Sequence, residues 1–183
     1  MTIKQSTELG PHRQGQLDSL CGIYAILNGM GLAAQHYGKR WSVRPKALFK
    51  QSLDFLDEQE CKNITRYGLG EDDWLDLARH IFGLVAAKGA ADFKRGKRAL
   101  RDLPDDFDAT VAEIENAVTK GTPVAIRVKK PWNHYTVVSY VDGDKWILFD
   151  SYGYKSIRRG SVGGEGSGKR FILGRKAIFF LPK

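Results

Sequence analysis

The hydrophobic pattern of this chain changes its period once, near Val124, and that change constrains the fold more than any other feature. Before this residue, apolar side chains recur every three or four positions, which is typical of amphipathic helices. After it, apolar and polar residues alternate in short runs between glycine-containing turns, which is typical of strands. A helical half (about 16–121) followed by a β half (about 122–182) therefore predicts one α+β domain, with helices packed on an antiparallel sheet.

The helical half should begin with a central, buried helix. We expect it to start near Leu20, with Asp18 or Ser19 as its N-cap, and to stop at Gly38. Its sequence is apolar on nearly every side, although Gly29 weakens its helical propensity. Three further helices are predicted: from Pro45 to about Gln59, from Gly70 to Gly83, and from about Asp108 to Gly121.

The β half contains five apolar runs that are short enough to be strands. A turn at 142–144 should join the second and third of them into a hairpin. The glycine-rich segment 163–170 nearly fits a phosphate-binding loop, but Arg170 stands at the hydroxyl position and no helix follows. We therefore expect a flexible loop that borders a cleft. The predicted strands are 124–128, 134–141, 145–149, 171–173 and 177–181.

The chain is basic, with a formal net charge of +8. This balance predicts an acidic partner, substrate or surface. No base-reading motif accompanies the charge, so nucleic-acid binding is not expected. The densest basic cluster consists of Lys94, Arg95, Lys97, Arg98 and Arg101.

Cofactor, metal and membrane sites find little support in the sequence. The two cysteines are too few for a thiolate cage, and the four histidines show no metal-binding spacing, so we expect no metal or cofactor. No apolar run is long enough to span a bilayer. The first eight residues are polar and do not form a secretory signal, which makes the cytoplasm the expected compartment.

Cys21 is a candidate nucleophile because of its position. It lies in the first turn of the central helix, where free N–H groups and the helix dipole stabilise a thiolate. Gly22 follows directly, and its missing side chain would either let a substrate backbone approach the sulfur or allow close local packing. A cysteine in an apolar helix is also a common small core residue, so its position alone leaves both interpretations open.

His134 is the candidate base. It opens an apolar strand directly after Trp132 and Asn133, a position that suits a cleft and makes these two neighbours candidates for substrate binding. The other three histidines have ordinary structural explanations: a loop for His12, a helix C-terminus for His36 and an amphipathic helix for His80.

Asp150 is the candidate residue to orient His134. With a three-residue hairpin turn, position 150 would oppose Thr136 and share a sheet face with His134. Such diagonal neighbours lie roughly 7–8 Å apart at the backbone, within reach of an imidazole and a carboxylate. A two- or four-residue turn would place the two side chains on opposite faces, so this assignment depends on the length of the turn.

An upstream glutamine is a candidate for oxyanion stabilisation. Gln16 lies five residues before Cys21, so its amide could fold back over the start of the helix. There it would act beside the Cys21 backbone N–H. Gln14 is the alternative, and the shorter reach favours Gln16.

These segments, taken together, resemble papain-like cysteine peptidases. The segment Gln16–Asn28 is similar to the nucleophile region of C39-like bacterial peptidases and of Josephin deubiquitinases. The later segments 117–128, 133–140 and 148–151 are similar to the C39-like lead-in, histidine strand and aspartate. The resemblance implies a papain-like fold, with Cys21 as nucleophile, His134 as base, Asp150 as orienting residue and Gln16 as oxyanion residue. Leu20 departs from the C39-like pattern, which has an aspartate before the cysteine.

The expected function is a thiol hydrolase that cleaves a peptide, isopeptide or related amide bond in a protein or peptide substrate. By the resemblance, this substrate would be a ubiquitin-like tail or a leader peptide. An acyltransferase with the same residues and a non-catalytic binding module remain the alternatives.

Overall fold

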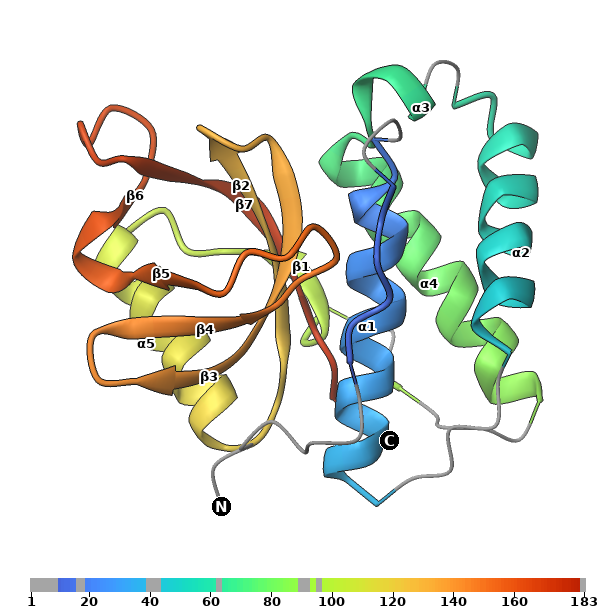
Figure 1. Ribbon diagram of the computed structural model, residues 1–183, viewed down its shortest axis with the longest axis horizontal. Helices are drawn as coiled ribbons and strands as arrows, with labels where there is room; N and C mark the ends of the chain where they lie inside the picture. The colour runs from blue at the N-terminus through green and yellow to red at the C-terminus, as the bar shows by residue number, and fades with distance from the viewer. Residues whose placement is uncertain are drawn as a thin grey trace.

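A seven-stranded sheet separates two layers of helices (Figure 1). The computed structural model describes residues 10–15, 19–38, 44–61, 64–88, 93–94 and 97–181. The predicted α+β class is confirmed: helices occupy most of the first half, and a mainly antiparallel sheet occupies the second.

The sheet has the strand order β1-β7-β2-β3-β4-β5, with β6 beside β7. All neighbours on this path are antiparallel, whereas β6 runs parallel to β7. The central strands β2 and β3 are apolar on both faces, because helices cover both sides. The strands are β1 (Leu100–Asp102), β2 (Val124–Lys130), β3 (His134–Asp142), β4 (Lys145–Phe149), β5 (Ser156–Arg158), β6 (Val162–Gly163) and β7 (Phe171–Phe179).

Helices α1 and α4 lie against one face of the sheet, with α2 beyond them, whereas α5 covers the other face (Figure 1). Neighbouring residues of one strand therefore belong to different layers: Val137 packs with α1, and Val138 packs with α5. The helices are α1 (Cys21–His36), α2 (Pro45–Glu58), α3 (Ile64–Tyr67), α4 (Glu71–Ala87) and α5 (Phe107–Thr119), and a 3-10 turn, η1, spans Arg159–Ser161.

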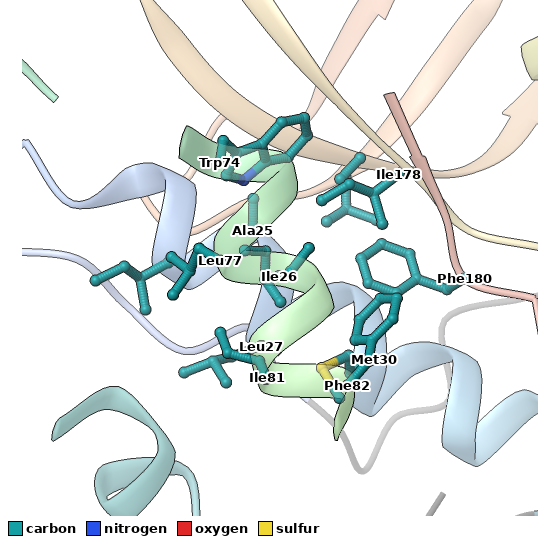
Figure 2. Close-up of a cluster of buried hydrophobic side chains, with 14 of the residues drawn as sticks. Ala25, Ile26, Leu27, Met30, Trp74, Leu77, Ile81, Phe82, Ile178 and Phe180 are labelled. Atoms are coloured by element: carbon teal, nitrogen blue, oxygen red, sulfur yellow. The ribbon is translucent and has the colours of Figure 1, made fainter. Parts of the chain in front are cut away.

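The larger core includes most residues of α1, as expected for a helix that is apolar on nearly every side. Figure 2 shows side chains of α1 packed with those of α4 and with Ile178 and Phe180. Gly29 is the contact point: a Cβ there would lie 2.1 Å from the ring of Phe180. The glycine therefore lets α1 approach the chain just after β7, which explains a residue that lowers helical propensity.

Several predicted boundaries need correction. Leu20 takes the N-cap position of α1 without a side-chain cap, while the Ser19 hydroxyl donates to the carbonyl of Arg66, and Asp18 lies outside the described residues. Helix α4 continues past Gly83 to Ala87 because its apolar face continues through Val85. The two strands predicted at 171–173 and 177–181 form one strand, β7, and the division into halves is crossed by β1, which pairs with β7.

Within the described residues, no helix is long and apolar enough to cross a membrane.

Candidate active site

Cys21 is the first residue of α1 and is almost fully buried. The carbonyl of Leu20 accepts hydrogen bonds from the N–H groups of Ile23 and Tyr24, which closes the first helical turn. The backbone N–H of Tyr135, in β3, donates to Cys21 Sγ at 3.5 Å. The sulfur thus lies where the start of α1 meets the start of β3, and a thiolate there would face two sources of partial positive charge.

His134 is held between Cys21 and Asp150. Its Nε2 lies 2.7 Å from Asp150 Oδ2, and both side chains are buried. Burial alone would lower the pKa of His134, but hydrogen bonds to Asp150 and Cys21, with the charges of both, raise it to about 9. With Nε2 engaged by Asp150, Nδ1 is the ring nitrogen left for the thiol.

Asp150 is fixed by a turn of backbone donors. Its Oδ1 accepts hydrogen bonds from the N–H groups of Tyr152, Gly153 and Tyr154 at 2.9, 2.8 and 3.1 Å. Burial would raise the pKa of this carboxyl, but the hydrogen bond from His134, its charge and the backbone donors hold the pKa below its usual value. The carboxylate therefore stays ionised and keeps the imidazole in one orientation.

The β3–β4 hairpin brings His134 and Asp150 together by a route different from the predicted one. The turn has two residues, Gly143 and Asp144, instead of three, because Asp142 pairs with Lys145. A β-bulge at Ser139 then adds one residue to β3, so Val137 pairs with Phe149. The bulge compensates for the shorter turn and restores the register in which His134 and Asp150 share a face.

Cys21 and His134 line a pocket of about 360 Å³ that includes aromatic and cationic side chains. Tyr67, at the end of α3, and Tyr152, after β4, are the large apolar side chains most exposed among the described residues. The pocket is lined by Gln14, Ser19, Cys21, Arg66, Tyr67, Gly68, Leu69, Arg127, Trp132, Asn133, His134, Tyr135, Tyr152 and Tyr154.

Trp132 and Asn133, the candidate substrate-binding residues, both line this pocket. Trp132 stacks on Tyr154 with ring centroids 3.9 Å apart, and Tyr154 in turn contacts the edge of His134. Asn133 Oδ1 accepts a hydrogen bond of 2.7 Å from Arg127 Nη2. The rings of Trp132 and Tyr154 therefore form one side of the pocket, next to the imidazole of His134.

Gly22 does not have the predicted place beside a substrate. It is buried, and a Cβ there would contact Leu69 and Trp74, each at 3.1 Å. Its carbonyl accepts a hydrogen bond from Trp74 Nε1. Gly22 is absent from the described lining of the pocket, so close packing of α1 against α4 explains this glycine.

The two glutamines differ in what the structure describes. Gln14 lines the pocket, and its Oε1 accepts a hydrogen bond from the Ser151 hydroxyl while its N–H donates to the Ser151 carbonyl. Gln14 therefore ties the segment before α1 to the residue after Asp150. Gln16 lies outside the described residues.

Tyr152, Tyr154, Arg127, Arg66 and Tyr67 line the pocket but were not predicted from the sequence. The Asp-Ser-Tyr-Gly-Tyr order at 150–154 was the available signal for the first two, because a strand-end aspartate followed by a glycine predicts a tight turn. The other three come from segments far apart in the chain, which no local pattern connects. Among the described residues, no group of three His, Cys, Asp or Glu side chains could hold a metal ion.

No family model, curated protein or solved structure matches this chain.

Proposed function

We propose that this protein is a papain-like cysteine hydrolase that cleaves a peptide, isopeptide or related amide bond. The observation that carries the proposal is the chain of contacts from Cys21, at the start of α1, through His134 to the buried carboxylate of Asp150. A thiol, an imidazole and a carboxylate in this order form the arrangement that activates a nucleophile. The pocket in front of the sulfur gives a substrate access to it.

In the first half-reaction, the Cys21 thiolate attacks the carbonyl carbon of the scissile amide. The electron pair of the C=O bond moves to oxygen and forms a tetrahedral oxyanion. As this intermediate collapses, the imidazolium of His134 gives its proton to the leaving amine. The products are a free amine and a thioester on Cys21.

In the second half-reaction, neutral His134 removes a proton from water, and the resulting hydroxide attacks the thioester. The carboxylic acid leaves, and the proton returns to the thiolate–imidazole pair. Asp150 remains ionised throughout and stabilises the imidazolium through Nε2.

We propose the Cys21 backbone N–H and the side-chain amide of Gln16 as the oxyanion donors. Gln14, which lines the pocket, is the alternative donor, and the shorter reach to the start of α1 favours Gln16. Gln16→Ala should slow turnover by about 10²-fold, the usual effect of removing one such donor, and Gln14→Ala should slow it less. Turnover of the two variants on one substrate checks this, and a larger loss for Gln14→Ala would reverse the assignment.

Thiol reactivity tests the proposed nucleophile. Burial and the charge of Asp73 raise the pKa of Cys61, which makes this second cysteine a matched internal control. At about pH 6, iodoacetamide should alkylate Cys21 at least tenfold faster than Cys61, because an imidazolium beside the sulfur favours the thiolate. Mass spectrometry of the two cysteine peptides measures both rates. Equal, slow labelling would contradict the proposal and favour a non-catalytic binding module.

The chemistry itself is tested with a trapped substrate. When incubated with a lysate, Cys21→Ala protein should bind the protein or peptide that the wild type cleaves. The variant should not cleave this substrate. Full turnover by Cys21→Ala would contradict the assignment of the nucleophile. Adding an amine to the wild-type reaction shows whether water or an amine resolves the thioester, since an acyltransferase would give the amide product.

A further inference from the structure

A second pocket, of about 460 Å³, adjoins the first at Arg127 and Asn133, which line both. Asn133 directly precedes His134, so the second pocket begins next to the proposed catalytic base. It extends along β2 towards the glycine-rich segment between β6 and β7. Its lining consists of Arg127, Lys129, Lys130, Asn133, Glu165, Gly166 and Ile172.

The second pocket carries three cations and one carboxylate among its described lining residues. Arg127 and Lys129 are two apart on β2, and both line the second pocket. Arg127 uses Nη2 to bond Asn133 and lies over the ring of Tyr135, at 5.4 Å from the centroid. Its Nε is shielded from solvent and has no hydrogen-bond partner among the described residues.

Glu165 shows how a carboxylate is held there. Its Oε1 lies 2.6 Å from Lys129 Nζ, although the Glu165 side chain is 74% exposed. The hydrogen bond and charge of Lys129, followed by the charges of Lys130 and Arg175, lower the pKa of Glu165. An exposed ion pair of this kind contributes little to stability. A carboxylate from another molecule can therefore replace Glu165 at small cost.

We propose that the second pocket binds an acidic side chain, Asp or Glu, of the substrate, close to the bond that is cleaved. This proposal rests on the proposed function, because it assigns a preference to the same active site. Arg127 and Lys129 hold the substrate carboxylate, and Glu165 competes with it for Lys129. Removing Glu165 should therefore strengthen binding of an acidic substrate, an effect that a purely structural role for the loop would not produce.

The test of specificity uses paired peptide vinyl sulfones that alkylate Cys21. The two members of each pair differ only at one position, where one has Glu and the other has Gln. Each pair places this difference at another position of the peptide. We expect the Glu member to react roughly two- to fivefold faster at one position, the effect of a partly exposed ion pair. Intact-mass measurements at low salt, where exposed charges are least screened, give the rates.

Three variants connect this preference to the pocket. Lys129→Glu should abolish or invert it, whereas Glu165→Gln should increase it. Lys50→Glu, the same charge change at an exposed position of α2, should leave it unaltered. If the Glu and Gln members alkylate Cys21 at equal rates at every position, the proposed acidic preference of the second pocket is wrong. The proposed hydrolase would not be affected by this result.

A binding measurement decides the proposal if no probe alkylates Cys21, an outcome that would instead count against the proposed hydrolase. N-acetyl-glutamate methylamide is titrated into isotope-labelled Cys21→Ala protein, and binding is followed by nuclear magnetic resonance. The amide signals of 127–130 and 164–166 should shift with this compound and not with its glutamine analogue. Equal signal shifts with both compounds would contradict binding of an acidic side chain in the second pocket, independently of the reactivity of Cys21.

Discussion

His134 keeps its proton well above neutral pH because its imidazolium lies between two acidic partners. Burial opposes the charge, but the Asp150 carboxylate and the Cys21 thiol outweigh burial, and the pKa of His134 rises to about 9. The three backbone N–H groups that donate to Asp150 contribute to this raised pKa, because they hold the carboxylate that stabilises the imidazolium.

Asp150→Asn should therefore lower the pKa of His134 and slow alkylation of Cys21 at pH 6 roughly tenfold, because less imidazolium is present to favour the thiolate. Nuclear magnetic resonance of the histidine ring gives the pKa, and mass spectrometry gives the alkylation rate. Asp144→Asn, at an exposed aspartate in the β3–β4 turn, is the matched control and should change neither. An unchanged His134 pKa in Asp150→Asn would contradict the role of Asp150.

The same pair predicts how stability depends on pH. The pKa of His134 is higher in the folded protein than its ordinary 6.5, so its contribution is complete below pH 6.5 and is lost as pH rises towards 9. The pKa of Asp150 is lowered, so its contribution is present above about pH 3.8 and is lost as pH falls further. The free energy of unfolding in urea should therefore fall by on the order of 2 kcal/mol between pH 6.5 and 9. A similar fall in Asp150→Asn would contradict this origin.

At the scale of single elements, α1 combines a poor local propensity with a good fit. Replacing a helical glycine by alanine ordinarily stabilises a helix by about 1 kcal/mol. In Gly29→Ala, however, the new methyl group would overlap the Phe180 ring. We expect a net loss of about 1–3 kcal/mol, the usual effect of overpacking. Urea unfolding measures it, and stabilisation by Gly29→Ala would show that Phe180 moves aside freely.

Long elements with a clear period were predictable from the sequence. The start of α2 at Pro45 and the bounds of β4, 145–149, are confirmed, because proline favours a first helical turn and a Gly-Asp turn directly precedes β4. Strands β1 and β5 have three residues each, too few to show an alternation. The bulge at Ser139 was also hidden, since β3 is apolar on both faces and its pattern does not reveal a change of face.

The candidate site was predictable in part for the same reason. Cys21 and His134 stand at the first residues of α1 and β3, where a change of pattern is visible. The pairing of His134 with Asp150 depended on a register that the turn alone does not determine. Arg66 and Tyr67 reach the pocket from α3, through tertiary packing that local patterns do not encode.

At the scale of the whole molecule, two buried clusters share one sheet. Trp74 belongs to the cluster around α1, and Trp146 belongs to the cluster under α5. Trp146 also donates to Glu115, which an ion pair connects to Arg159, so α5 is fixed to β4 and η1. Because β2 and β3 contribute side chains to both clusters, neither layer keeps its core when the sheet is lost.

We therefore expect one cooperative unfolding transition. Two proteins with a single tryptophan, one retaining Trp74 and one retaining Trp146, would report on the two layers separately. In each protein, the fluorescence midpoint in urea should coincide with the midpoint of the far-ultraviolet circular dichroism. A separate, earlier fluorescence transition for Trp146 would show that the α5 layer unfolds independently.

The bulge at Ser139 also makes the tip of the β3–β4 hairpin a useful attachment point. Gly143 is exposed there, and nothing lies within 4 Å of where its side chain would be. Asp142, the last residue of β3 before the tip, is eight residues from His134, roughly 26 Å at the usual rise of a strand. An affinity tag or a fluorescent reporter inserted between Gly143 and Asp144 would thus immobilise or label the protein far from the thiol. The bulge at Ser139 lies between the inserted tag or reporter and His134, where it can accommodate a change in the register of β3 and β4.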